Sequence, residues 1–340
     1  MRKEVIGLGA LNYDVLYVVE RIAKGGEEVG IIDVKKAPGG SAANTIVALA
    51  RLGVDTGFVG TVGNDEEGKW ILEDLMEEGV ETRIKKREGY TGAAVAFVDA
   101  RGERALYILP GVNDRLCIED VDREFVNHTK ILHTSSFVNR EQLEMQRELA
   151  KRIHNKTKLS FSPGMLCFKY ELDDLTELIE RSEVVFISAD ELKSLVKKED
   201  YERGTELLLD AGARIVCVTL GGKGCYVADS STGESHLIDA YPTDVVDTTG
   251  AGDAFAAGFL FALLRDKSLY ESGKTGNLVA SFCIREYGGR KGLPYKKFIP
   301  ATLQKGARKQ KINYRHRLTQ INTDDKNQHD KTKINLRKSV

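Results

Sequence analysis

The chain has 340 residues, of which 41% are hydrophobic and 30% charged, values typical of a soluble globular protein with one large or two modest domains. No stretch approaches the roughly 18 consecutive apolar residues of a membrane-spanning helix, and the N-terminus carries no secretory signal, so we expect a cytoplasmic protein without a membrane partner. The formal net charge is −1, and since residues 303–340 carry +8, the rest of the chain carries −9; such an acidic body does not suggest nucleic acid as a partner.

The cysteines and the basic end of the chain give two further expectations. Five widely spaced cysteines contain no C-x-x-C pair, which indicates free thiols in a reducing compartment. From Leu303 to Val340, eleven lysines and arginines stand against three aspartates. We expect one domain over residues 1–302 and a basic, disordered tail over residues 303–340, with a weak nucleic-acid arm as the alternative.

The N-terminal residues 5–11 are typical of a buried strand. Gly7 and Gly9 suggest a dinucleotide-binding loop, but Asn12 occupies the third glycine position and a strand-like run follows, so the pattern fails. Asn12 and Asp14 are two residues apart and share a face if the chain is extended. They are candidates for hydrogen bonds to a polar ligand, and a simple turn is the alternative.

A second glycine loop, Gly39-Gly40, leads into a helix predicted up to residue 52. Ser41 is a candidate N-cap of this helix. Asn44 lies in the first turn, where it is a candidate ligand contact; the alternative is a local hydrogen bond to the backbone.

Two strand clusters, at about residues 11–37 and 90–112, lie outside the alternating strand and helix rhythm. We expect them to form a small β-sheet that acts as a lid.

From residue 131 onward, predicted strands at 131–134, 159–161, 184–187 and 215–220 alternate with helices. This pattern predicts an α/β fold: a doubly wound, mostly parallel central sheet flanked by helices. Ligands of such sheets bind beyond the carboxyl ends of the strands, where the glycine loops fall. Residues 273–275 imitate the end of a nucleotide-binding loop, but no glycine stands at position 268, and we interpret them as a turn before a helix at 275–287.

The loop Thr248-Thr249-Gly250-Ala251-Gly252 runs into an apolar helix predicted at residues 254–264. Backbone amides at a helix start, together with the helix dipole, form an anion site. Asp253 stands at the edge of this site, where a carboxylate could take a proton from an attacking hydroxyl. The alternative is a glycine-rich turn with an acidic residue at a helix start.

Three stretches together resemble the ribokinase-like (PfkB) carbohydrate kinase family: Gly39-Gly40-Ser41-Ala42-Ala43-Asn44, Thr219-Leu220-Gly221-Gly222-Lys223-Gly224 and Asp247-Thr248-Thr249-Gly250-Ala251-Gly252-Asp253. The match runs from residue 5 to about residue 300. The resemblance implies a kinase that moves the γ-phosphoryl of ATP to a hydroxymethyl group of a sugar or nucleoside. It also implies the fold described above, with a β-sheet lid through which many relatives form dimers.

The resemblance also implies roles for individual residues. The catalytic set is Asp253 as general base, with the amides of Gly250, Ala251 and Gly252 as an anion hole. The acceptor contacts are Asn12, Asp14, Gly39, Gly40 and Asn44. The nucleotide contacts are Ser188, Thr219, Gly221, Gly224 and Asn277. The metal set is Glu191, which would reach Mg²⁺ through water, and Asp247 and Thr249, which match the monovalent-cation loop that would take K⁺.

Two positions depart from the family pattern. Ser188 stands where the family usually has asparagine, and Ser162 stands where many members have aspartate. Both positions lie near the expected metal and phosphates. We therefore expect ATP and Mg²⁺ as donor and cofactor, and leave open ADP as donor, a nucleoside or ribose phosphate as acceptor, and a sugar-binding regulator without turnover.

Overall fold

The computed structural model describes residues 2–99 and 104–304. Its main sheet, within that part of the chain, has nine strands in the order β13-β12-β11-β10-β9-β8-β1-β4-β5. The strands are β1 (Lys3–Leu8), β4 (Thr56–Gly63), β5 (Glu81–Arg87), β8 (Thr129–Ser135), β9 (Lys158–Ser162), β10 (Ser182–Ser188), β11 (Ile215–Thr219), β12 (Cys225–Asp229) and β13 (Glu234–Ile238). Pairing is parallel from β11 to β5, and antiparallel only at β12 and β13.

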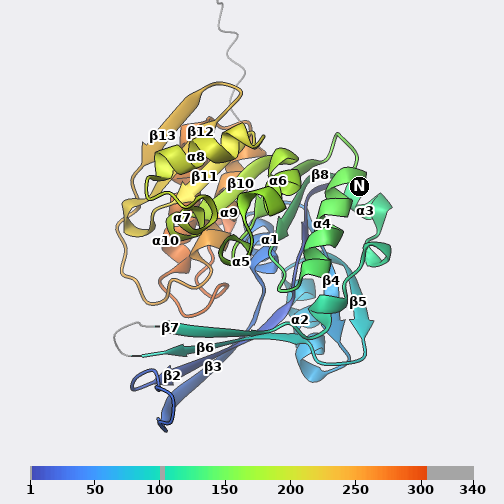
Figure 1. Cartoon of the computed structure of the whole chain (residues 1–340), viewed down its shortest axis with the longest axis vertical. Helices are drawn as coiled ribbons and strands as arrows, with labels where there is room; N and C mark the ends of the chain where they lie inside the picture. Colours follow the sequence, from blue (N-terminus) through green and yellow to red (C-terminus); the bar gives the residue numbers. More distant parts are fainter. Residues whose placement is uncertain (1, 100–103, 305–340) are drawn as a thin grey trace, which may run out of the picture. The chain divides into compact units, whose positions relative to one another are not determined.

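Helices cover both faces of this sheet (Figure 1). They are α1 (Ser41–Arg51), α2 (Glu66–Glu77), α3 (Arg123–Asn127), α4 (Arg140–Arg152), α5 (Leu166–Lys169), α6 (Leu172–Glu180), α7 (Ala189–Val196), α8 (Tyr201–Asp210), α9 (Ala251–Leu263), α10 (Leu269–Cys283) and α11 (Ala301–Gln304). Successive residues of one strand point to opposite faces. Phe186 of β10 accordingly joins the hydrophobic cluster under α1, α9 and α10, whereas Ile187 joins the cluster under α4, α6 and α7. The predicted doubly wound sheet is confirmed.

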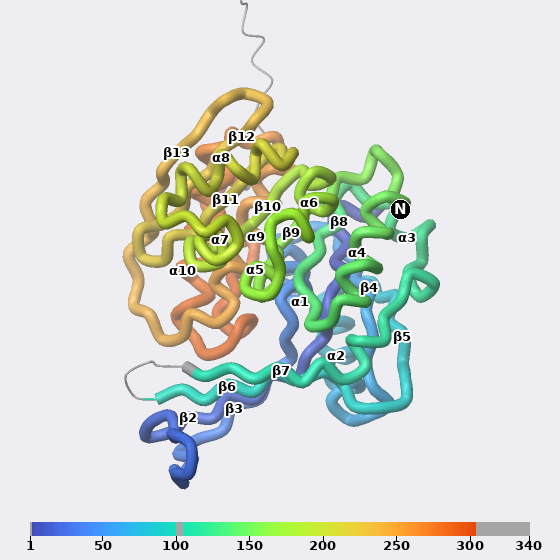
Figure 2. The backbone as a smooth tube through the Cα atoms, in the orientation of Figure 1, coloured from blue at the N-terminus to red at the C-terminus, as the bar shows by residue number. Residues whose placement is uncertain are grey.

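A smaller four-stranded sheet has the order β3-β2-β6-β7 and is built from β2 (Asn12–Val19), β3 (Ile31–Gly39), β6 (Gly92–Val98) and β7 (Arg104–Leu109). Its two hairpins, β2-β3 and β6-β7, are antiparallel, and β2 and β6 join them in a parallel pair. Figure 2 shows the backbone leaving the main sheet after β1 to form this small sheet. The predicted accessory sheet is confirmed, and we call it the lid sheet.

Three details differ from the sequence predictions. Helix α10 begins at Leu269, so residues 273–275 are helical and are not a turn; Ser268 caps this helix by accepting a hydrogen bond from the Glu271 amide. Gly40, and not Ser41, is the N-cap of α1. Strands β5 and β13, at the two edges of the main sheet, were not predicted. The strongly charged run of β5 has little of the apolar character expected of a strand.

Within the described residues, all five cysteines are free, as predicted, and no helix is long and apolar enough to cross a membrane. The predicted tail falls almost entirely outside the described residues, so its boundary and character stay predictions.

Candidate active site

The start of α9 supplies unpaired backbone amides. Gly250 is the N-cap, and the first bond of the helix runs from the Ala254 amide to the Gly250 carbonyl at 2.9 Å. The amides of Gly252 and Asp253 precede this bond and so have no partner within the helix. The Ala251 amide donates to the Thr248 carbonyl at 3.1 Å. Of the three predicted anion-hole residues, Ala251 therefore closes the turn with its amide, and the geometry adds the Asp253 amide to the candidate donors.

The two glycines of this turn, Gly250 and Gly252, differ in their surroundings. Gly250 has a φ of +76°, and a Cβ there would lie 2.5 Å from the Gly289 Cα, so the backbone itself requires glycine. Gly252 is exposed, and a Cβ there would meet no atom within 4 Å. The space beside Gly252 is therefore open to a ligand.

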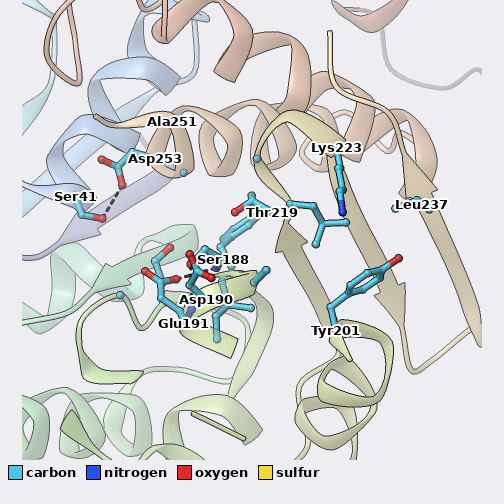
Figure 3. Close-up of a pocket in the computed structure, with 18 of the residues that line it drawn as sticks. Ser41, Ser188, Asp190, Glu191, Tyr201, Thr219, Lys223, Leu237, Ala251 and Asp253 are labelled. Carbon is cyan, nitrogen blue, oxygen red and sulfur yellow. Dashed lines mark hydrogen bonds between the residues drawn. The ribbon is translucent and has the colours of Figure 1, made fainter. Parts of the chain in front are cut away.

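Asp253 is held by two side chains of α1. Its Oδ1 accepts a hydrogen bond from the Ser41 hydroxyl at 2.7 Å, which Figure 3 shows, and its Oδ2 accepts one from the Asn44 Nδ2 at 3.0 Å. Burial raises the pKa of Asp253 from 3.8 to about 6; the bonds from Asn44 and Ser41 oppose this rise, and the Glu191 carboxylate adds to it. A carboxylate with this pKa is mostly ionised at neutral pH and is a competent proton acceptor.

Two cavities meet at Asp253. One, of about 930 Å³, is lined by residues of β10, α7 and the turn after β11, and we call it the Thr219 cavity. The other, of about 1010 Å³, lies under the lid sheet, and we call it the Asn12 cavity. Residues that line both are Ser41, Gly164, Glu191, Ala251, Gly252 and Asp253. The carboxylate thus stands at the junction of two compartments.

The Thr219 cavity collects most of the predicted nucleotide residues. Ser188, Glu191, Thr219 and Gly221 line it, and Figure 3 shows Ser41 and Asp253 at one end with Tyr201, Lys223 and Leu237 at the other. Ser188 also caps α7, since its hydroxyl accepts a hydrogen bond from the Glu191 amide at 3.3 Å, and its own amide donates to the Glu191 carboxylate at 2.8 Å.

Gly224 and Asn277 are not among the residues that line this cavity. The Asn277 side-chain amide donates instead to the carbonyls of Ile238 at 3.0 Å and Asp239 at 3.1 Å. Asn277 therefore fixes the backbone of a segment that includes the lining residue Asp239.

Sequence reasoning did not identify two residues of the Thr219 cavity. Tyr201 lies on α8, which no motif marks, and Lys223 lies inside the glycine turn that carried the resemblance. Among the described lining residues, Lys223 is the one cation beside the carboxylates of Asp190, Glu191, Asp239 and Asp253. A polyanionic ligand would therefore need metal ions as well as Lys223 to balance its charge.

The Asn12 cavity collects the predicted acceptor residues. Asn12, Asp14, Gly40 and Asn44 line it, and Gly39 lies beside it at the end of β3. The Asn12 Oδ1 accepts a hydrogen bond from the Asn113 Nδ2 at 3.0 Å, so Asn12 is oriented by a side chain from the segment after β7.

Arg290 is a further lining residue of this cavity, and it is 5% exposed. It was not predicted, because nothing in its local sequence indicates burial. Its partners Asp74 and Asn44 are 216 and 246 residues away in the chain.

The predicted metal residues lie in two places. The Asp247 carboxylate accepts hydrogen bonds from the Thr249 amide at 2.9 Å, the Thr249 hydroxyl at 2.8 Å and the Gly288 amide at 2.8 Å, so it ties the loop before α9 to the segment after α10. Glu191 stands at the junction of the two cavities. Among the described residues, no three His, Cys, Asp or Glu side chains form a group that could hold a metal ion. This donor set fits Mg²⁺ held mainly by phosphate oxygens and water, with Glu191 as the protein carboxylate beside it.

Known proteins resemble this chain over most of its length. The model of the pfkB family carbohydrate kinases matches residues 2–296. An uncharacterized sugar kinase of Archaeoglobus fulgidus is 36% identical over 73% of this chain and 98% of its own length. An ATP-dependent ribose-1-phosphate kinase of Halopiger xanaduensis is 31% identical over 84% of this chain and 93% of its own length. The solved structure of Arabidopsis thaliana ribokinase complexed with ribose and ATP aligns with a TM-score of 0.77 and 26% identity, over 90% of this chain and all of the other. The chain belongs to the pfkB family of carbohydrate kinases.

Proposed function

We propose that this protein transfers the γ-phosphoryl group of ATP to a hydroxymethyl group of a small sugar. The observation that carries the proposal is the position of Asp253, at the junction of two cavities beside the free amides of a helix start. One cavity has the size and the glycine turn to hold a nucleotide, and the other is lined by polar side chains suited to hydroxyl groups.

In this proposal Asp253 is the general base. Its carboxylate accepts the proton of the acceptor hydroxyl as that oxygen attacks the γ-phosphorus. Ser41 and Asn44 each donate a hydrogen bond to one oxygen of the carboxylate and so orient it. The amides of Gly252 and Asp253 at the start of α9 are the proposed donors to the transferring group, whose charge they would stabilise together with the helix dipole.

The remaining lining residues bind and position the two substrates. Thr219, Gly221 and Lys223 lie along the proposed nucleotide side, and Asn12 and Asp14 lie on the proposed sugar side under the lid sheet. Glu191 is the carboxylate that would contact the water shell of a bound Mg²⁺, and the ion would supply positive charge to offset that of the phosphates. Asp247 and Thr249 are the residues we propose for a monovalent cation such as K⁺.

A phosphorylated sugar is the second candidate acceptor. Lys35 of β3 lines the Asn12 cavity, with its Nζ 3.1 Å from the centroid of the Tyr287 ring. Within the described residues Lys35 forms no ion pair, so its charge is available to an anionic group of a ligand. One similar protein is a ribose-1-phosphate kinase, which favours the same candidate.

A coupled kinase assay tests both candidates. Ribose, other small sugars, nucleosides and ribose phosphates serve as acceptors, with ATP, ADP and GTP as donors. We expect ATP-dependent turnover on a sugar or sugar phosphate. If a sugar phosphate is the acceptor, Lys35→Ala raises its KM at least tenfold and leaves the KM for ATP unchanged. Tight sugar binding without turnover on any acceptor would refute the kinase proposal and favour a regulator.

A further inference from the structure

A line of hydrogen bonds runs from a buried guanidinium to the proposed base. The Arg290 Nε donates to the Asn44 Oδ1 at 2.9 Å, and the Asn44 Nδ2 donates to the Asp253 Oδ2 at 3.0 Å. Asn44 is 4% exposed and Arg290 is 5% exposed, so water does not compete for these bonds.

The orientation of the Asn44 side-chain amide follows from the hydrogen-bonding chemistry of its two partners. A guanidinium has only donors, and an ionised carboxylate has only acceptors. An amide placed between them satisfies both only with its oxygen toward Arg290 and its NH2 group toward Asp253. The reversed amide would set oxygen against carboxylate and NH2 against guanidinium, and both contacts would be repulsive. Arg290 therefore determines which group Asn44 presents to the base.

Arg290 is itself held on three sides. Besides Asn44, it forms an ion pair with Asp74 of α2, and one of its terminal nitrogens donates to the Gly39 carbonyl at 3.1 Å. Burial lowers the pKa of Arg290 and raises that of Asp74, so their pairing is what makes two buried charges tolerable. The guanidinium thus joins α1, α2 and the end of β3 at the inner wall of the Asn12 cavity.

We propose that Arg290 is a positioning residue for phosphoryl transfer: it fixes the Asn44 amide so that its NH2 group holds the Asp253 carboxylate ionised and oriented for the acceptor hydroxyl. This inference rests on the proposed function in that it takes Asp253 as the base. The charged and titratable groups that act on Asp253 are Arg290, Glu191 on α7 and Cys283 on α10, and Asp74 and Asp14 act on Arg290. Among these groups Arg290 is the cation, so its removal and the removal of its counter-ion have opposite effects on the base.

The test uses two variants that act in opposite directions. Arg290→Met removes the cation and frees the Asn44 amide, and it should raise the pKa of Asp253 by about half a pH unit or more. Asp74→Asn leaves Arg290 without its counter-ion and should lower the pKa of Asp253. The pKa is read in the full-length protein by NMR titration of ¹³C-labelled aspartate, with the Asp253 signal assigned from Asp253→Asn. The acid limb of the pH profile of kcat gives the same readout in the assay.

Two further variants complete the design. Arg290→Lys keeps the charge but not the planar fork, so it should give a value between those of wild type and Arg290→Met. Arg147→Met removes a partly buried guanidinium that pairs with Glu177 on the outer face of α4 and α6, and it should leave the Asp253 titration unchanged.

The outcomes separate the positioning role from a structural one. A merely structural role would lower the melting temperature in both variants without moving the Asp253 titration in opposite directions, and that result would overturn the inference. Should Arg290→Met fail to fold, Asp74→Asn and Arg290→Lys decide the question. Because the NMR titration needs no turnover, absence of kinase activity would refute the proposed function and leave this test intact.

Discussion

Asp253→Asn should stabilise the fold while it abolishes most of the activity. Burial raises the pKa of Asp253 from 3.8 to about 6. At about 1.36 kcal/mol per pH unit, this rise sets a ceiling of about 3 kcal/mol on the cost of keeping the carboxylate ionised in the folded state. The carboxylate is only half-buried and borders two open cavities, so we reduce the expected gain to about 1 kcal/mol. An asparagine can still accept from Asn44 and donate to Ser41, so no partner is orphaned.

The gain should depend on pH in a definite direction. The pKa in the folded state lies above the value in the unfolded state, so the ionised carboxylate destabilises the fold. This penalty is absent below about pH 4, grows through the interval between the two pKa values, and is complete above about pH 7. Calorimetry should show a melting temperature about 2 °C above wild type at pH 8, and a smaller gain at pH 5.

Activity is the second readout of the same variant. Loss of the base should lower kcat by about 10² to 10⁴ in the coupled assay, with the KM for ATP little changed. Asp210→Asn, which alters an exposed carboxylate at the end of α8 that lines neither cavity, is the control and should change neither quantity. A lower melting temperature at pH 8, or a gain that does not depend on pH, would refute the argument from burial. An unchanged kcat would remove Asp253 as the base.

Three other changes test the rest of the site. Gly252→Ala should lower kcat at least tenfold with an unchanged melting temperature, because its methyl group enters the space proposed for the phosphoryl group. Gly250→Ala should instead lower the melting temperature by several degrees, because its Cβ meets Gly289. Equal melting temperatures of the two variants would contradict this contrast. Lys223→Ala should raise the KM for ATP about tenfold and leave kcat within about twofold, because it removes a cation from a cavity rich in carboxylates. An unchanged KM for ATP would mean that the phosphates do not bind beside Lys223. Chelation with EDTA should abolish turnover without lowering the melting temperature, since no group of three metal-ligating side chains is found in the described part of the chain. A large drop in the melting temperature would reveal a structural metal.

The residues that meet at the junction of the two cavities can be selected from the sequence because each of them carries a local signal. Asp253 follows a glycine turn at a helix start, and Asn44 is a polar residue in an apolar first turn. The strand and helix rhythm likewise predicts the doubly wound sheet and the separate lid sheet. These signals are short-range, and the backbone around them largely determines where the side chains point.

The features that were missed depend on contacts between distant segments. Arg290 becomes a buried residue only because Asp74 and Asn44, more than 200 residues away in the chain, supply its partners. The start of α10 was misplaced because its glycines resemble a turn. In the structure Gly273 lies inside this helix, where a Cβ would come within 2.5 Å of the Ile238 side chain, so this glycine permits close packing of α10 against β13.

The residues that line the two cavities on either side of Asp253 come from different parts of the sequence. Apart from the shared residues, the Thr219 cavity takes its lining from residues 162–239, whereas much of the Asn12 cavity comes from residues 10–114 and 287–291. Under the proposed function, donor choice and acceptor choice are therefore encoded in different stretches of sequence. On that proposal, substitutions in the lid strands and in the segment after α10 would change the acceptor of this protein and leave its nucleotide side intact.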